Sequence, residues 1–283
     1  MHIGFIGLGI MGVPMALNLS RKYPLTVWNR SPSKYSLLEQ AGASIAETPA
    51  QVMKRSDIIF VMLFDSTAIK CILDDEFKRS LRGKILVNAS SVEVEFSYFL
   101  ADEVRRAGGD FIEMPVSGST IPAEQGRLVG LMAGDEAVAE RIRLVVQPIT
   151  CAAVYCGPVG FGLKTKYAVN SYLVTMNAGL AESMNFAKAQ GLDLSAFGQA
   201  LAACPLASPY SKVKVKKMLA GDWSAQAPIS GIYTSIQLIE AAVAGANTHS
   251  PVLHICSKLY QEANRSGLGE EDMIAVAKVI ENL

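Results

Sequence analysis

The chain has 283 residues, enough for one large domain or two ordinary ones. Its 26 Lys and Arg balance its 26 Asp and Glu, which argues against a nucleic-acid partner or a membrane-surface role, because both favour a basic excess. Half of the residues are hydrophobic, yet no apolar run reaches the ~18–20 residues that span a bilayer. We therefore expect buried parallel strands, and helices covered in a homodimer or homotetramer.

The first thirty residues have the pattern of a dinucleotide-binding site. The apolar run Ile3–Ile6 leads directly into Gly7-Leu8-Gly9-Ile10-Met11-Gly12, and an apolar stretch with helical spacing follows. A strand, G-x-G-x-x-G and a helix in this order are the dinucleotide fingerprint, in which the helix N-terminus receives the pyrophosphate. The first glycine makes a tight turn, the second admits the pyrophosphate and the third lets helix and strand pack closely. The cofactor contacts expected in this turn are Gly7, Leu8, Gly9, Ile10 and Met11.

The end of the second predicted strand, Leu25–Trp28, indicates which dinucleotide binds. An NAD site usually carries Asp or Glu about 20 residues beyond the glycines, to bind the ribose 2′-hydroxyl. Asn29-Arg30-Ser31 stands there instead, with no carboxylate to repel a 2′-phosphate. Arg30 can pair with that phosphate through a charge-assisted bond, helped by Asn29 and Ser31. The sequence therefore predicts NADPH/NADP+ as cofactor. An alternative role for Arg30 is an ordinary solvated turn residue.

Strands and helices alternate through the first part of the chain and helices alone follow. This predicts a Rossmann-type, doubly wound α/β domain over residues 1–164 and an all-α domain over 165–283, which begins with a long helix over Thr165–Gln190. The second domain is expected to serve substrate binding and oligomerisation. Ser208-Pro209 and Ser250-Pro251 each have the pattern of a helix start. Further strands are predicted over Ile58–Leu63, Ile85–Asn88, Asp110–Met114, Leu128–Ala133 and Ala153–Tyr155; further helices over Pro14–Ser20, Ser33–Gln40, Ala50–Lys54, Phe96–Arg106 and Glu136–Val146.

Three further segments carry candidate site residues. Met62 and Leu63, and then Ser91 in Asn88-Ala89-Ser90-Ser91, end two of the predicted strands and are expected to border the cofactor, Ser91 at its nicotinamide end. The loop after Met114 contains Ser117-Gly118-Ser119, whose hydroxyls and backbone N–H groups can hold a small carboxylate. Taken alone, that loop is more often an ordinary turn.

A catalytic pair is predicted at the domain border, in the run from Gly160 to Asn170. Lys166 and Asn170 lie one helical turn apart and so share a helix face. A carbonyl that receives a hydride needs a proton, and a lysine can donate it if burial lowers its pKa toward neutrality. Asn170 can orient the substrate oxygen. We expect the neighbouring Lys164 to be solvated.

These motifs together resemble the β-hydroxyacid dehydrogenase family, which includes 3-hydroxyisobutyrate dehydrogenase, 6-phosphogluconate dehydrogenase and the glyoxylate/succinic semialdehyde reductases. The segments that carry the resemblance are Gly4–Gly12, Pro115–Ser119 with Ala123, Glu124 and Gly126, and Gly160, Gly162, Lys166 and Asn170. The resemblance implies that Lys166 is the acid/base, that Asn170 and Ser117-Gly118-Ser119 bind substrate, and that Ser91 lies beside the nicotinamide. Trp28–Ser31 and Val169 look most like the NADPH-dependent glyoxylate/succinic semialdehyde reductases.

Two departures bear on the substrate. The family usually has Asp at position 88, where this chain has Asn88, and a Lys-Asp pair in its C-terminal helix, where this chain has Thr234-Ser235. The loss of that lysine should weaken the binding of an anionic substrate. Thr234 would then line a less charged wall, suited to a larger or less acidic carbonyl compound.

Three functions follow. The first is an NADPH-dependent reductase of small aldehydes or 2-oxo acids, reversible as a hydroxyacid dehydrogenase. The second is an imine reductase on the same fold, against which Lys166 counts and for which Thr234 counts slightly. The third is a non-catalytic NADP(H)-binding scaffold, which the intact Lys166 and Asn170 argue against.

The remaining features predict little chemistry. The five cysteines and three histidines have no metal-ligand spacing, so we expect no metal site and buried free thiols. The lysine run from Lys212 to Lys217 is expected to form a solvated face. The N-terminus lacks the pattern of a signal peptide, which favours a cytoplasmic location.

Overall fold

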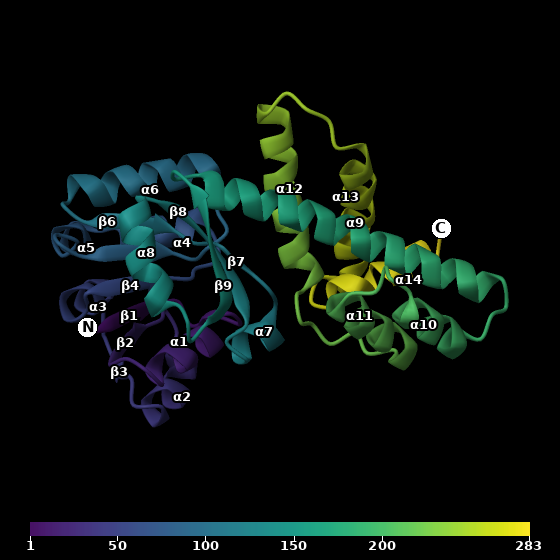
Figure 1. Cartoon of the computed structure of the whole chain (residues 1–283), viewed down its shortest axis with the longest axis horizontal. Coiled ribbons are helices and arrows are strands. Elements are labelled where there is room, and N and C mark those ends of the chain that lie inside the picture. Colours follow the sequence, from purple (N-terminus) through teal and green to yellow (C-terminus); the bar gives the residue numbers. More distant parts are fainter. The chain divides into compact units, whose positions relative to one another are not determined.

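The computed structural model describes residues 1–283, which separate into two compact units, Met1–Lys166 and Tyr167–Leu283 (Figure 1). The first unit is a mainly parallel sheet covered by helices, and the second is helical. The predicted fold class is therefore confirmed. The border between the units lies within one helix, α9 (Phe161–Ala189), which begins in the first unit and continues into the second.

The first unit is built on one nine-stranded sheet in the order β3-β2-β1-β4-β5-β6-β8-β7, with β9 paired to β8. The strands from β3 to β6 are parallel, β8 is antiparallel to β6 and β7, and β9 is parallel to β8. The carboxyl ends of β1, β2, β4, β5 and β6 therefore meet at one edge. The strands are β1 (Ile3–Ile6), β2 (Leu25–Trp28), β3 (Ser44–Ile45), β4 (Ile58–Val61), β5 (Ile85–Asn88), β6 (Asp110–Glu113), β7 (Val116–Ser117), β8 (Leu128–Gly134) and β9 (Thr150–Gly157).

Capping side chains begin several helices of this unit. Thr48, Asp65, Asp74 and Asp135 each accept a backbone N–H of the helix that they precede. Helices α4, α5 and α7 and the short strands β3 and β7 were not predicted. The helices are α1 (Gly12–Ser20), η1 (Pro32–Lys34), α2 (Tyr35–Gln40), α3 (Pro49–Arg55), α4 (Ser66–Ile72), α5 (Asp75–Arg79), α6 (Val94–Arg106), α7 (Thr120–Glu124) and α8 (Glu136–Val145).

The central strands are buried on both faces, as their continuous apolar sequences predict. Phe5 of β1 stacks on Phe60 of β4 with ring centroids 6.1 Å apart, and both side chains are fully buried. Met15 and Leu19 of α1 pack into the same core. This core fixes the ends of β1 and β4, from which the residues of the candidate site project.

The second unit continues from α9 through α10 (Leu194–Ala203), α11 (Pro209–Ala220), α12 (Ile229–Gly245), α13 (Pro251–Ala263), η2 (Asn264–Leu268), η3 (Met273–Ala275) and α14 (Val276–Ile280). Ser208 caps α11 with Pro209 at the first helical position, as predicted, and Ser211 completes a capping box that was not predicted. Ser250 precedes α13 in the predicted position, but its side chain makes no capping hydrogen bond. None of these helices is long and apolar enough to cross a membrane.

The prediction of a solvated lysine run was wrong for two of its members. The Nζ atom of Lys214 lies 2.7 Å from Oδ1 of Asp272, and both side chains are buried. Lys217 is buried as well and pairs with Asp222 at 2.8 Å. The sequence could not show this, because the carboxylates come from a loop and from a segment far along the chain. The prediction of buried thiols was also wrong, since only Cys256 is buried.

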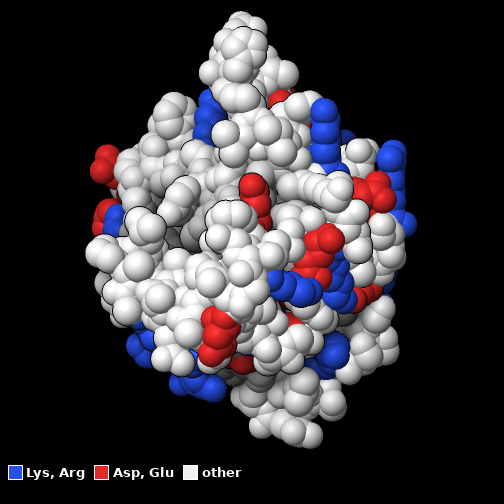
Figure 2. Space-filling view, turned by 90° about the vertical axis from the view of Figure 1, so that its right-hand side faces the viewer, with Lys and Arg blue, Asp and Glu red and all other residues white.

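Charges elsewhere are mixed in sign. On the face shown in Figure 2, basic and acidic side chains lie interspersed among uncharged ones, and neither kind gathers into a broad patch. This agrees with the balanced composition.

Removal of one partner of the buried pair should destabilise the second unit strongly. Asp272 also accepts the backbone N–H groups of Gln226 and Ile274, so Lys214→Ala leaves a buried carboxylate without its cation. We expect a loss of about 3–5 kcal/mol in the free energy of unfolding, measured by urea denaturation. Lys54→Ala, which breaks the exposed pair with Glu76, is the control and should change stability little. Equal losses in the two variants would contradict this account.

Candidate functional site

The turn between β1 and α1 is shaped by the absence of side chains. Gly7 has a φ of +102°, and a Cβ on it would lie 2.2 Å from the carbonyl oxygen of Met62. A Cβ on Gly12 would lie 1.9 Å from the carbonyl oxygen of Gly7. Both glycines are therefore required by the fold itself.

Gly9 is different, because no atom lies within 4 Å of the position that its Cβ would take. The fold does not need a glycine there, but close approach of a ligand does. Helix α1 begins next to it without a side-chain cap, since Met11 precedes the helix. The turn thus presents backbone N–H groups and open space together, which fits the pyrophosphate of a dinucleotide.

Asn29 ties this turn to the end of β2. Its Oδ1 accepts the backbone N–H of Leu8 at 3.0 Å, and its Nδ2 donates to the carbonyl oxygen of Ser31 at 2.9 Å. Its backbone N–H and carbonyl both bond to the hydroxyl of Tyr35. The Asn29 side chain thus organises the two cofactor loops, a contribution that sequence spacing alone did not indicate.

Arg30 and Ser31 are exposed, and Arg30 takes part in no ion pair. Its guanidinium is therefore free to bind an anion. The nearest chain neighbours bring no carboxylate, because Trp28, Asn29 and Ser31 are uncharged.

The ends of β4 and β5 complete this edge of the sheet. The backbone N–H of Leu63 donates to Oγ of the buried Ser90 at 2.9 Å, which joins the two strand ends. Met62 and Ser91 are half-buried on either side of that bond. Phe64 follows with 76% of its surface exposed, an apolar ring at the cofactor edge that was not predicted.

Ser117 ends β7, and Gly118 and Ser119 follow it in the turn before α7. Gly118 is exposed and has a φ of +132°, and Ser117 and Ser119 on either side of it are half-buried. The buried Asn18 of α1 holds the following helix α7 by donating from Nδ2 to the carbonyl oxygen of Ala123 at 2.8 Å. The loop is thus connected to the same helix that begins at the glycine turn.

Lys166 lies in the second turn of α9, buried and without an ion pair. Burial lowers the pKa of its ammonium to about 8, because an amine away from water is less stable when charged. Asn170, one turn further along, is also buried, and its Oδ1 has no hydrogen-bond partner. A buried amide oxygen left without a donor is costly unless a ligand supplies one. By contrast, Lys164 is exposed, as expected.

Helix α9 begins four residues earlier than the sequence indicated, at Phe161 instead of Thr165. The reason is Glu113, at the end of β6, which is fully buried and accepts the backbone N–H groups of Gly160 and Leu163 at 3.0 and 2.8 Å. This role of Glu113 was not predicted, because no local spacing links it to α9.

In the second unit, Thr234 lies on α12, half-buried, and its Oγ1 donates to the carbonyl oxygen of Ser230 at 3.1 Å. Helix α12 carries no basic residue, and Glu240 is its one charged side chain. The helix therefore offers no cation to a ligand.

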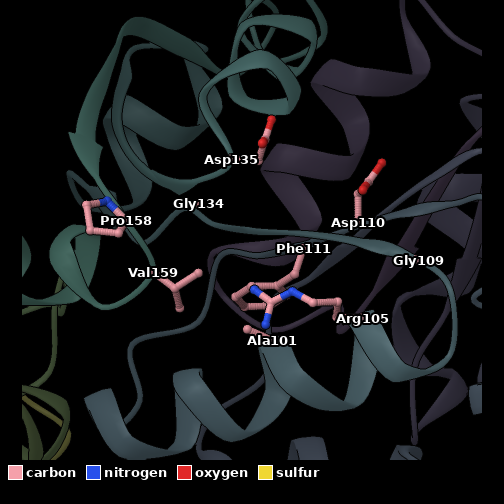
Figure 3. Close-up of a pocket in the computed structure, with 9 residues that line it drawn as sticks. All are labelled: Ala101, Arg105, Gly109, Asp110, Phe111, Gly134, Asp135, Pro158 and Val159. Carbon is pink, nitrogen blue, oxygen red and sulfur yellow. The ribbon is translucent and has the colours of Figure 1, made fainter.

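The cavity drawn in Figure 3 is a separate feature of the first unit. It has a volume of about 400 Å³ and is lined from α6, the start of β6, the end of β8 and the turn after β9. Asp110 begins β6, so the cavity lies at the opposite edge of the parallel strands from the glycine turn. Asp135 already caps α8 and Arg105 pairs with Asp102 at 2.8 Å, so two of its charged side chains are engaged within the protein.

Comparison with known proteins connects these features. Residues 2–157 match the NAD binding domain of 6-phosphogluconate dehydrogenase, and residues 160–280 match the NAD-binding domain of NADP-dependent 3-hydroxyisobutyrate dehydrogenase. The chain belongs to the β-hydroxyacid dehydrogenase family. It is an oxidoreductase of that family, and its cofactor is a nicotinamide dinucleotide.

Two relatives match over nearly their whole length. Glyoxylate/succinic semialdehyde reductase 1 of Arabidopsis thaliana is 32% identical to this chain, and the match covers 99% of this chain and 98% of the relative. The 2-hydroxy-3-oxopropionate reductase of Escherichia coli is also 32% identical, and the match covers 99% of this chain and 97% of the relative. The solved structure of Psf3 with NADP+ and 2-OPP shares the fold, with a TM-score of 0.90 at 24% identity over 98% of this chain and 99% of its own.

The two glycines give opposite expectations for substitution. Gly9→Ala should fold with an unchanged melting temperature and bind the dinucleotide at least about tenfold more weakly, because the methyl group fills space that the pyrophosphate needs. Gly12→Ala should lower the melting temperature, because its methyl group collides with Gly7. Thermal denaturation and fluorescence titration with the reduced cofactor measure both. Unchanged cofactor binding by Gly9→Ala would show that the pyrophosphate does not bind at this turn.

Proposed function

We propose that the chain is an NADPH-dependent reductase of small aldehydes or 2-oxo acids, of the glyoxylate/succinic semialdehyde type, reversible as a hydroxyacid dehydrogenase. The observation that carries the proposal is Lys166, a buried amine with no counter-ion and a pKa of about 8, one turn from an amide oxygen without a partner. Those properties suit a general acid that works near neutral pH.

The steps follow from the chemistry of these side chains. A bound NADPH would supply the hydride. Asn170 orients the substrate, and the Lys166 ammonium donates its proton to the carbonyl oxygen as negative charge develops there. Ser117, Gly118 and Ser119 hold the substrate carboxylate through hydroxyl and backbone N–H groups. In the reverse direction, neutral Lys166 accepts the proton of the hydroxyl group.

The preference for NADPH rests on Arg30 and Ser31. Two strand spacings separate the ends of β2 and β4, with the glycine turn between them, which supports the proposal that both loops border one dinucleotide site. An unpaired guanidinium at the end of β2 binds a 2′-phosphate, whereas the carboxylate typical of NAD sites is absent.

The lack of a basic residue on α12 favours a second candidate, reduction of a neutral or larger substrate such as an imine. The negative charge of a small anionic substrate would then have to be stabilised by Lys166 and by hydrogen bonds from Ser117, Gly118 and Ser119. The two candidates differ in the substrates that they accept.

A homodimer or homotetramer is also proposed. Within the second unit, Tyr172 and Phe186 of α9 are 71% and 65% exposed, and Val252 and Ile255 of α13 are 59% and 62% exposed. Exposed apolar side chains of this size are typical of surfaces that pair with another chain.

Turnover should distinguish the two substrate classes. NADPH consumption is followed with glyoxylate, succinic semialdehyde, tartronate semialdehyde, methylglyoxal, a bulkier 2-oxo acid and a cyclic imine, each with NADH in parallel. The proposal expects the acidic aldehydes to give the highest kcat/KM. Turnover of the imine or of neutral carbonyls alone would replace it with the second candidate, and tight NADPH binding without any turnover would indicate a binding scaffold.

Loss of the charge at position 30 should affect one cofactor selectively. Arg30→Ala is expected to raise the KM for NADPH by about 10- to 100-fold, the value of one or two charge-assisted hydrogen bonds, and to leave the KM for NADH nearly unchanged. Lys34→Ala removes an equal charge from the same loop and serves as control. A similar rise in both KM values would show that Arg30 does not bind the 2′-phosphate.

The pH dependence should reflect Lys166. Reduction needs the protonated amine, so the kcat of reduction should fall as the pH rises through about 8. Oxidation of the hydroxyacid needs the neutral amine, so the kcat of oxidation should fall as the pH drops through the same value. Lys166→Ala should lower kcat by about 100- to 10,000-fold and retain NADPH binding. Lys164→Ala is the matched control and should retain activity. A wild-type kcat in Lys166→Ala would show that Lys166 is not the general acid.

A further inference from the structure

We infer that Glu113 is a positioning residue for catalysis, which sets the place of Lys166 by fixing the first turn of α9. The inference rests on the proposed role of Lys166. Glu113 is not expected to touch substrate or cofactor, because it acts through the helix backbone.

Backbone and side-chain donors converge on the Glu113 carboxylate. Oε2 accepts the backbone N–H of Gly160 at 3.0 Å, and Oε1 accepts that of Leu163 at 2.8 Å. The hydroxyl of Ser97, from α6, donates to Oε2. Burial raises the pKa of Glu113, while these hydrogen bonds oppose that rise. A fully buried carboxyl is costly unless hydrogen bonds compensate for the lost water, and here the backbone of α9 supplies most of them.

The start of α9 cannot cap itself. The preceding residues are Gly157, Pro158, Val159 and Gly160, none of which has a side-chain acceptor. The helices of this unit that have a side-chain cap take their acceptor from the residue directly before them. Helix α9 instead receives its cap from a strand about 50 residues earlier in the chain, as the separation of Glu113 and Leu163 shows.

This distant cap fixes the helix to the sheet. Glu113 pairs in register with Asn88 of β5 and Ala133 of β8, so its backbone is held on both sides. Its two oxygens then contact N–H groups three residues apart, which sets both the height and the rotation of the first turn. Gly162 contributes by having no side chain, because a Cβ there would lie 2.9 Å from Oε1.

Lys166 is the residue that gains from this precision. It lies three residues beyond Leu163, about 4.5 Å along the helix axis. A proton donor displaced by about 1 Å can lose about 100-fold in rate. A change confined to the cap should therefore appear in kcat, while the cofactor turn around Gly9 is unaffected.

The test compares two helix caps in the same unit. Glu113→Gln keeps the shape of the side chain but replaces one acceptor oxygen with a donor group aimed at backbone N–H groups. Asp135→Ala removes the cap of α8, which carries no candidate site residue. We expect kcat to fall by about 10- to 100-fold in Glu113→Gln with the KM for NADPH within about twofold of the wild type, and Asp135→Ala to keep its kcat.

A second measurement is independent of turnover. Competitive acetylation of the lysines across pH, with peptide mass spectrometry, gives the titration midpoint of Lys166, expected near 8 in the wild type. A loosened first turn admits water, so Glu113→Gln should raise that midpoint toward the 10.5 of an exposed lysine. Asp135→Ala should leave it unchanged.

The outcomes separate the two proposals. An unchanged kcat and an unchanged Lys166 midpoint in folded Glu113→Gln would overturn the role of Glu113, as would equal losses of kcat in Asp135→Ala. A raised midpoint with wild-type protein inactive on the whole substrate panel would leave Glu113 in place and overturn the proposed function. If Glu113→Gln does not fold, Ser97→Ala, which removes only the hydroxyl donor, should show the same changes at smaller size, and their absence would overturn the role.

Discussion

The start of α1 and the start of α9 both lack a capping side chain in the residue directly before the helix, and the two starts differ in what lies next to their backbone N–H groups. Helix α1 follows Met11, which makes no capping bond, and opens onto the space beside Gly9. Helix α9 follows Gly160 and is capped by the buried carboxylate of Glu113. One N-terminus is thus left for an anionic ligand, while the other is filled by the protein itself.

This difference matches the tasks of the two helices. In the proposed function the first helix accepts the pyrophosphate of the cofactor, and an internal cap would compete with that phosphate. The second carries Lys166, the proposed proton donor, for which a displacement of about 1 Å would cost about 100-fold in rate. A carboxylate anchored in the sheet provides that stiffness, whereas a cap from the preceding loop would move with the loop.

The distribution of charge follows the same separation of roles. Several basic residues pair with carboxylates, including two lysines that are buried in the second unit. Arg30 and Lys166 stay unpaired, one exposed at the end of β2 and the other buried in α9. An exposed cation suits recognition of a 2′-phosphate, and a buried amine with a lowered pKa suits proton transfer. Helix α12 carries no cation, in contrast to these two positions.

The family, the fold class and most long elements were determined by the sequence, because apolar periodicity and the glycine spacing are local properties. Gly7, Gly9 and Gly12 could be assigned different tasks from their spacing alone, and their surroundings agree with those tasks. Only the tertiary structure decided how α9 begins, that Asn29 links the two cofactor loops, and that Lys214 and Lys217 are buried. Most of these features depend on a partner distant in the chain, such as Glu113 or Asp272, and hydrogen bonds between distant segments leave no spacing in a single sequence from which to infer them.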